Sequence, residues 1–297
     1  MLDEIPEAEV RVADPNVPET ERTSGDSGTE ILQGTFDPLQ GRLLGADNAE
    51  WGDVSDLGLG ATRTKASTRV IRAWTDPFGR KGIGRKTDFD SNEVWVSYCA
   101  KLADDWNPSS NMKMPGFAAH TTGGAATPAD YSSAIGGQGG GGAGGQRSWS
   151  ARMALTTPHS SVPGGLGFEM YHKDSSNQVA DGRVYGEPMW LGKGLDESGP
   201  RAEGSIGDFQ WHCIKQHVKL NTVNRRDGIV EAWLDNNIRF RRTDLNLSDN
   251  EEHRNISFWF ELFHGGSADK TGTEHSVFFS DFNFSLGSQD TTKCGCL

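Results

Sequence analysis

Apolar side chains occupy every odd position between residues 149 and 155. The odd positions carry Trp, Ala, Met and Leu, whereas Ser150 and Arg152 occupy even positions. A period of two is typical of a β-strand that buries one face and presents the other. The pattern therefore predicts a strand at 148–156 whose outward face carries a hydroxyl and a guanidinium.

The same alternation returns in residues 166–173. Two large apolar residues share one parity, and the opposite parity carries Glu169, Tyr171 and Lys173. A carboxylate, a phenol and an ammonium beside the hydroxyl and guanidinium of the preceding strand would form a surface that can bind and deprotonate an acidic sugar.

Further segments have the length, composition and turn-forming borders of strands. They are residues 68–74, 93–102, 210–220, 229–236, 256–263 and 276–284. No helix-period pattern extends beyond one or two turns. We therefore predict an all-β antiparallel sandwich or jelly roll. Its core should include Trp149, Met153, Phe168, Met170, Ile214 and Val218.

The charge distribution predicts how the chain is organised. The formal net charge is -12, and residues 1–60 hold fourteen Asp and Glu against three Arg, so the rest is close to neutral. An acidic segment with few large apolar groups cannot offset its ordering entropy. We expect a disordered or partner-bound acidic arm at 1–45, one β-domain at 46–286, and a C-terminal tail at 287–297.

Two other segments each admit two interpretations. Residues 63–86 carry eight Lys and Arg, which form either a solvated face or a surface for a polyanion, including the acidic arm itself. Residues 136–145 include eight Gly, which form either a long insertion between strands or a mobile lid.

Cysteine usage and hydropathy bear on the compartment. Cys99 and Cys213 lie in strand-like runs and are expected to pack as small apolar groups, whereas the sequence leaves open whether Cys294 or Cys296 forms a disulfide.

No run of about eighteen apolar residues predicts a membrane span, and no signal peptide is visible at the N-terminus. We expect an extracellular or virion-associated protein, with a cytosolic product as the alternative. No metal-ligand spacing appears, and no cofactor is expected.

Several motifs together resemble polysaccharide lyases of the alginate lyase and glucuronan lyase type. They are the Trp-His-Cys strand and Asn of 210–222, the Asp-Gly turn and Trp-x-Asp strand end of 227–235, Lys-Met-Pro-Gly at 113–116, Trp-Ser-Ala-Arg at 149–152, and the Phe-rich, Gly-Gly and Phe-Asn-Phe segments of 258–284. The resemblance covers roughly residues 93–285. It implies a concanavalin-like β-jelly roll with a concave sheet that holds the sugar chain.

The resemblance also implies site residues. Lys113 matches the catalytic Lys of that family, and Ser150 matches a position on the face that carries Arg152. Arg152 would neutralise the uronate carboxylate, and Tyr171 would transfer a proton. His120 follows the lysine and is a candidate base, although a lone His is more often structural.

Other polar residues are candidates for substrate binding. Lys215, His217 and Lys219 alternate with apolar residues, so they either line a polyanion groove beside Arg152 or meet solvent. Glu169 and Lys173 would join the same surface, and Glu169 would then need a basic partner.

Three functions are compatible with the sequence. The favoured one is a metal-independent lyase that cleaves a uronic-acid polymer such as alginate or glucuronan by β-elimination. The second is a carbohydrate-binding jelly roll without chemistry. The third is a virion structural or attachment protein docked through the acidic arm. The expected partner is an anionic polysaccharide, and nucleic acid is not expected.

Overall fold

The computed structural model describes residues 31–32, 42–47, 49–53, 69–75, 83–103, 112–119, 149–156, 165–172, 185–188, 206–249, 251, 254–264, 275–292 and 295–296. Within these ranges only the backbone is described for residues 31–53, 69, 75, 83–86, 156, 165, 168–169, 171, 185–188 and 263–264.

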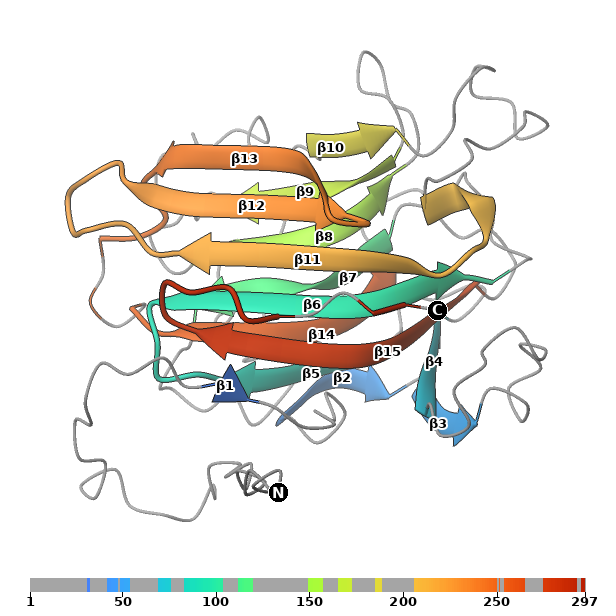
Figure 1. The fold of residues 1–297 in the computed structure, drawn as a ribbon. Coiled ribbons are helices and arrows are strands. Elements are labelled where there is room, and N and C mark those ends of the chain that lie inside the picture. Colours follow the sequence, from blue (N-terminus) through green and yellow to red (C-terminus); the bar gives the residue numbers. More distant parts are fainter. Residues whose placement is uncertain are drawn as a thin grey trace, which may run out of the picture.

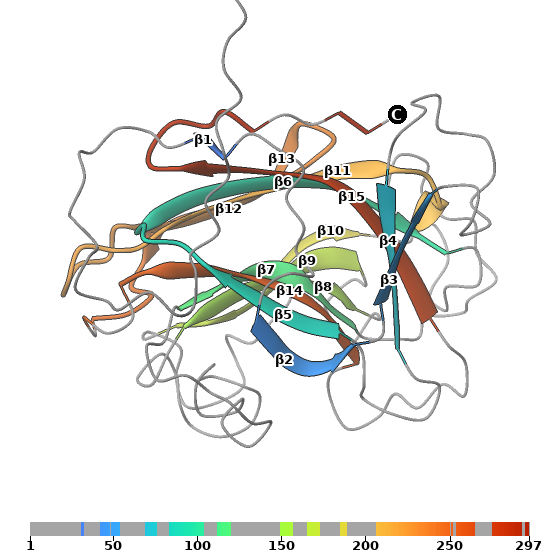
Figure 2. The ribbon, with the colours of Figure 1, turned by 90° about the horizontal axis from the view of Figure 1, so that it is seen from below.

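The strands form two antiparallel sheets that lie face to face (Figures 1 and 2). Sheet A has the order β13 (Asn237–Leu245), β12 (Gly228–Leu234), β11 (His212–Lys219), β6 (Glu93–Leu102), β15 (His275–Leu286), β4 (Arg69–Thr75) and β3 (Ala49–Asp53), with β1 (Ile31–Leu32) paired to β15. Sheet B has the order β10 (Tyr185–Pro188), β9 (Gly165–Tyr171), β8 (Ser150–Thr156), β7 (Met112–Ala119), β14 (Ile256–His264), β5 (Ile83–Asp88) and β2 (Arg42–Asp47). A 3-10 turn, η3 (Ile206–Asp208), precedes β11. The predicted all-β sandwich is confirmed.

The space between the sheets is filled by apolar side chains from both layers. Five of the six predicted core residues are buried there, and the side chain of the sixth, Phe168, lies outside the described part. Aromatic rings join the layers: Phe258 of sheet B meets Phe284 of sheet A edge-on, with centroids 5.0 Å apart. Such pairs add roughly 0.5–1.5 kcal/mol each beyond their burial.

All eight predicted strands are present, as β4, β6, β8, β9, β11, β12, β14 and β15. The expected boundary between arm and domain, near residue 46, falls inside β2. Moreover, Ile31 and Leu32 pair with Ser285 and Phe284, so this part of the acidic arm joins sheet A. Residues 1–30 lie outside the described part of the chain.

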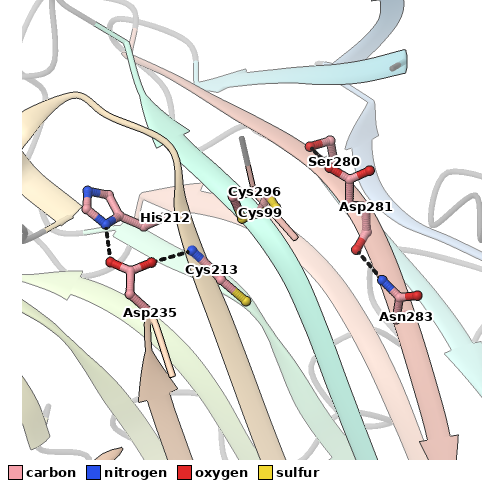
Figure 3. The surroundings of a disulfide bond; sticks show 8 residues. All are labelled: Cys99, His212, Cys213, Asp235, Ser280, Asp281, Asn283 and Cys296. Carbon is pink, nitrogen blue, oxygen red and sulfur yellow. Dashed lines mark hydrogen bonds and ion pairs between the residues drawn. A yellow bond between two sulfur atoms is a disulfide. The ribbon is translucent and has the colours of Figure 1, made fainter. Parts of the chain in front are cut away.

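The C-terminal tail is fastened to the outer face of sheet A. Cys99 forms a disulfide with Cys296, 197 residues away in sequence (Figure 3). Cys213, directly opposite Cys99 in the register of β6 and β11, is also disulfide-bonded, and its partner lies outside the described residues. The prediction that both pack as small apolar groups is wrong, because strand periodicity cannot reveal a tail that returns across the sheet. In the described part of the chain no helix is long and apolar enough to cross a membrane.

Candidate active site

An ion pair lies on the face of sheet B that points away from the core. Nη1 of Arg152, on β8, donates to Oε2 of Glu261, on β14, over 2.8 Å. Both residues are almost completely buried, with 3% and 1% of their surface exposed. The guanidinium also lies 4.6 Å from the ring centroid of Trp259, two residues before Glu261, within the range of a cation–π contact.

Lys113 lies on β7, the strand between β8 and β14. The pKa of Lys113 is lowered to about 7, chiefly because burial disfavours the ammonium and also because Arg152 is close, while Glu261 opposes the change. A lysine of this kind is present largely as a free amine just above neutral pH. It can therefore accept a proton, which an ordinary lysine cannot do there.

A β-bulge in β7 brings these groups together. Lys113 pairs with Ala154 and Gly116 with Arg152, so two residues of β7 oppose a single residue of β8. The register of β7 with β14 also shifts between Lys113 and Gly116. A Cβ on Gly116 would lie 2.5 Å from the Cα of Arg152 and 2.6 Å from the carbonyl oxygen of Ala151, so only glycine permits this approach of the backbones.

The remaining residues predicted on sheet B are only partly described. Ser150 is 1% exposed and shares the parity of Arg152. Its register partner on β9 is Tyr171, and the partner of Arg152 is Glu169. The side chains of Tyr171 and Glu169 lie outside the described part, so their roles stay predictions.

His120 and Lys173 lie wholly outside the described residues. Their suggested parts in the site, as candidate base and substrate ligand, therefore also stay predictions.

Lys215, His217 and Lys219 do not line a groove with Arg152. They belong to β11 of sheet A, and they point to its outer face, on the far side of the sandwich. The expectation of one shared face is wrong, because alternation tells which side of a strand faces the core but not which sheet the strand joins.

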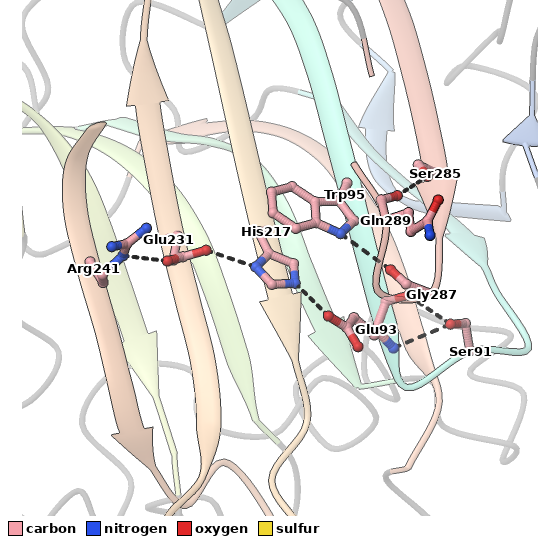
Figure 4. A network of polar contacts seen from close by, with 9 residues as sticks. All are labelled: Ser91, Glu93, Trp95, His217, Glu231, Arg241, Ser285, Gly287 and Gln289. Carbon is pink, nitrogen blue, oxygen red and sulfur yellow. Dashed lines mark hydrogen bonds and ion pairs between the residues drawn. The ribbon is translucent and has the colours of Figure 1, made fainter. Parts of the chain in front are cut away.

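Two of these side chains have other partners there, and the third meets solvent. His217 is held between Glu231 and Glu93, at 2.9 Å and 3.0 Å, and stacks on Trp95 at 3.6 Å (Figure 4). Lys215 pairs with the tail residue Asp290 at 2.7 Å. Lys219 is exposed to solvent.

Sequence reasoning missed Trp259 and Glu261. Both occupy the non-core parity of the correctly predicted strand at 256–263, where they alternate with the buried Phe258, Phe260 and Leu262. A charged residue at such a position was the available signal.

Among the described residues no group of three or more His, Cys, Asp or Glu could hold a metal ion. The described site thus offers a guanidinium, a lysine with a lowered pKa, a carboxylate and an aromatic ring, which suit an anionic ligand and a proton transfer.

Solved structures with this fold include alginate lyases. The alginate lyase Aly36B has 16% sequence identity and a TM-score of 0.52, over 82% of this chain and 98% of that one. An Aly36B variant in complex with alginate trisaccharide has 16% identity and a TM-score of 0.52, over 84% and 99%. The PL-14 alginate lyase of Aplysia kurodai has 17% identity and a TM-score of 0.52, over 75% and 85%.

No similar sequence was found among the curated proteins. The family model of polysaccharide lyase 14, in contrast, matches residues 80–282, a span that runs from β5 to β15 and includes Lys113, Arg152 and Glu261. This chain belongs to the polysaccharide lyase 14 family.

Proposed function

We propose that this protein cleaves a uronic-acid polymer, such as alginate or glucuronan, by β-elimination at the site of Lys113 and Arg152. The observation that carries the proposal is a lysine with a pKa of about 7 beside a buried, paired arginine. Family membership supports a lyase reaction, and the alginate oligosaccharide held by a structural neighbour supports the class of substrate.

The reaction needs a base, an acid and a positive charge. The base removes the proton from carbon five of the uronate, and the electrons of that C–H bond form the double bond between carbons four and five. The glycosidic bond at carbon four breaks, and its oxygen takes up a proton. Negative charge that develops towards the sugar carboxylate must be stabilised by a nearby cation.

The free amine of Lys113 is the proposed base. Arg152 has two effects that act together: its charge helps to keep Lys113 neutral, and it favours negative charge on the substrate. Glu261 holds the guanidinium in place. The phenol of Tyr171, whose backbone pairs with Ser150, is the proposed acid for the leaving oxygen, and proton exchange with water then resets both groups.

One observation favours a second candidate function, namely a carbohydrate-binding domain without catalytic activity. Arg152 is buried and already paired with Glu261, so a domain that binds polyuronates without cleaving them would also show this arrangement. Attachment to a virion through residues 1–45 stays a prediction that the described residues do not address.

The disulfide of Cys99 and Cys296 supports the proposed extracellular location, because such bonds persist mainly in oxidising compartments. Expression with export to an oxidising compartment should yield more folded protein than expression in a reducing cytosol. Equal yields of equally stable protein would count against that location.

The test is to incubate the purified protein with polymannuronate, polyguluronate and glucuronan, using neutral cellulose oligomers as a control. Products should carry an unsaturated non-reducing end, identified by mass spectrometry. Retention on an immobilised polyuronate without any such product would establish the binding module instead.

A further inference from the structure

A polar contact crosses the core directly beneath the bulge of β7. Nε2 of Gln216, on β11 of sheet A, donates to the carbonyl oxygen of Pro115, on β7 of sheet B, over 3.0 Å. The hydroxyl of Tyr98, on β6, donates to the same oxygen over 3.3 Å and accepts from Gln216 over 3.1 Å. Gln216 and Tyr98 are 0% and 1% exposed, so this link lies in the interior of the sandwich.

The bulge explains why Pro115 is the residue that is held. Met114 and Pro115 fall in the register shift between Lys113 and Gly116, and neither has a paired residue on β8 or β14. A buried carbonyl in such a position needs donors from elsewhere. Because proline also has no N–H, the bulge depends on contacts to this oxygen.

One atom of the link has no hydrogen-bond partner in the described part of the chain, which packing alone would not require. In the described part of the chain the Oε1 atom of Gln216 is buried without a hydrogen-bond partner. Leaving such a group unsatisfied costs roughly 1–3 kcal/mol, which an apolar side chain of similar length would avoid. Burial raises the pKa of Tyr98, so its hydroxyl stays protonated and able to donate.

We propose that Gln216 and Tyr98 are positioning residues for the lyase reaction: by holding the Pro115 carbonyl they fix the bulge, and with it the place of Lys113 beside Arg152. The opposite sheet thereby sets the geometry of the catalytic strand. This inference rests on the proposed function, but the position of Lys113 can be measured without substrate.

The experiment uses Gln216→Met and Tyr98→Phe in the full-length protein. Gln216→Met keeps the volume and removes both the donor and the unsatisfied oxygen, while Tyr98 still donates to Pro115, so the variant should stay folded, as thermal unfolding can check. The control is Asn221→Ala. Asn221 is equally buried, and its Oδ1 accepts from the backbone of Leu247 and Ser248 outside the link. Removing it should cost stability alone.

The first readout is the titration of Lys113 by lysine-selective NMR without substrate. Release of the bulge should let the amine move towards water and away from Arg152, so its pKa should rise by about one unit or more in both variants and not in the control. The second readout is turnover: kcat should fall ~10- to 100-fold while KM changes little.

Three outcomes would overturn the inference. The first is an unchanged titration of Lys113 in both variants, and the second is an equal change of that titration in Asn221→Ala. The third is a raised KM with an unchanged kcat. If the wild type releases no unsaturated product but the titration shifts as expected, the positioning stands and the proposed function fails. If the wild type is active and the titration does not shift, only the positioning fails.

Discussion

Arg152 and Glu261 lie 109 residues apart in sequence and form a 2.8 Å ion pair across β7, the strand that lies between β8 and β14. Removing one partner of a buried pair leaves an uncompensated charge, which typically costs about 3–5 kcal/mol. Glu261→Gln should therefore lower the free energy of unfolding by about that amount in urea denaturation. Asp244→Asn is the control, because its pair with Arg242 is largely exposed and should contribute less than about 1 kcal/mol. Equal effects of the two substitutions would contradict the buried pair.

The pH dependence of activity should follow Lys113. If the free amine is the base, kcat/KM should be lost as pH falls through about 7, because protonation removes the base. Lys113→Arg carries a permanent positive charge and supplies no free amine, so it should be inactive and still bind the polymer. A wild-type profile that stays flat from about pH 6 to about pH 8 would exclude Lys113 as the titrating group.

The two neighbours of Lys113 should move its titration in opposite directions. Glu261 raises the pKa of the lysine and Arg152 lowers it. In lysine-selective NMR, Glu261→Gln should shift the Lys113 titration to lower pH, and Arg152→Gln should shift it to higher pH. No shift in either variant would show that burial alone controls the pKa of the lysine, and shifts of the same sign would contradict the opposing effects of the two charges.

Gly116 should tolerate no side chain. An added Cβ would overlap the backbone of Arg152 and Ala151, so Gly116→Ala must push β7 and β8 apart at the site. We expect a loss of at least about 2 kcal/mol of stability together with loss of turnover. Gly295→Ala is the matched control, because in the described part of the chain no atom beyond its two sequence neighbours lies within 4 Å of an added Cβ, and it should change stability by less than about 0.5 kcal/mol. Normal activity of Gly116→Ala would contradict the close approach.

A second pH-dependent contact lies at the start of β11. Burial disfavours the imidazolium of His212, but two carboxylates outweigh this and raise its pKa above 6.5: Asp235 at 2.6 Å (Figure 3) and Asp208 at 2.8 Å. Hydrogen bonds to His212 and to the backbone of Cys213 in turn lower the pKa of Asp235 below 3.8, against its own burial.

The direction in which stability changes with pH follows from the linkage between protonation and folding. The contribution of His212 is complete below pH 6.5 and is lost as pH rises through its raised pKa, and that of Asp235 is lost as pH falls below 3.8. The stability difference between wild type and His212→Gln should thus be larger at about pH 5 than at about pH 8 in urea unfolding. A difference that does not change with pH would mean that folding leaves the pKa of His212 unchanged.

The hydrophobic pattern was sufficient to predict the fold. Strands with one apolar face, such as β8 and β11, were identified with their core-facing residues, because alternation is a direct record of burial. Two kinds of strand were missed because they lack a regular alternation. The residues of β13 are mostly exposed, and the bulge at Pro115 breaks the alternation of β7.

The site was only partly predictable. Lys113 and Arg152 were identified because they lie in recognisable motifs. Glu261 reaches the site only because β14 pairs with β7, and no local sequence pattern predicts that pairing. The same limit explains the error for His217, whose strand joins the other sheet. Pairing between distant strands, rather than the chemistry of single residues, was the missing information.

The initial rate of double-bond formation on polyuronates tests the central claim most directly. It is followed by the ultraviolet absorbance of the new carbon–carbon double bond, with wild type and Lys113→Met compared at equal concentration and with polymer binding measured in parallel. We predict that the wild type generates the absorbance on at least one of alginate and glucuronan, and that Lys113→Met binds the polymer but reacts at least ~100-fold more slowly. A wild type that generates no absorbance on any polyuronate, or a Lys113→Met variant that reacts at the wild-type rate, would contradict the account.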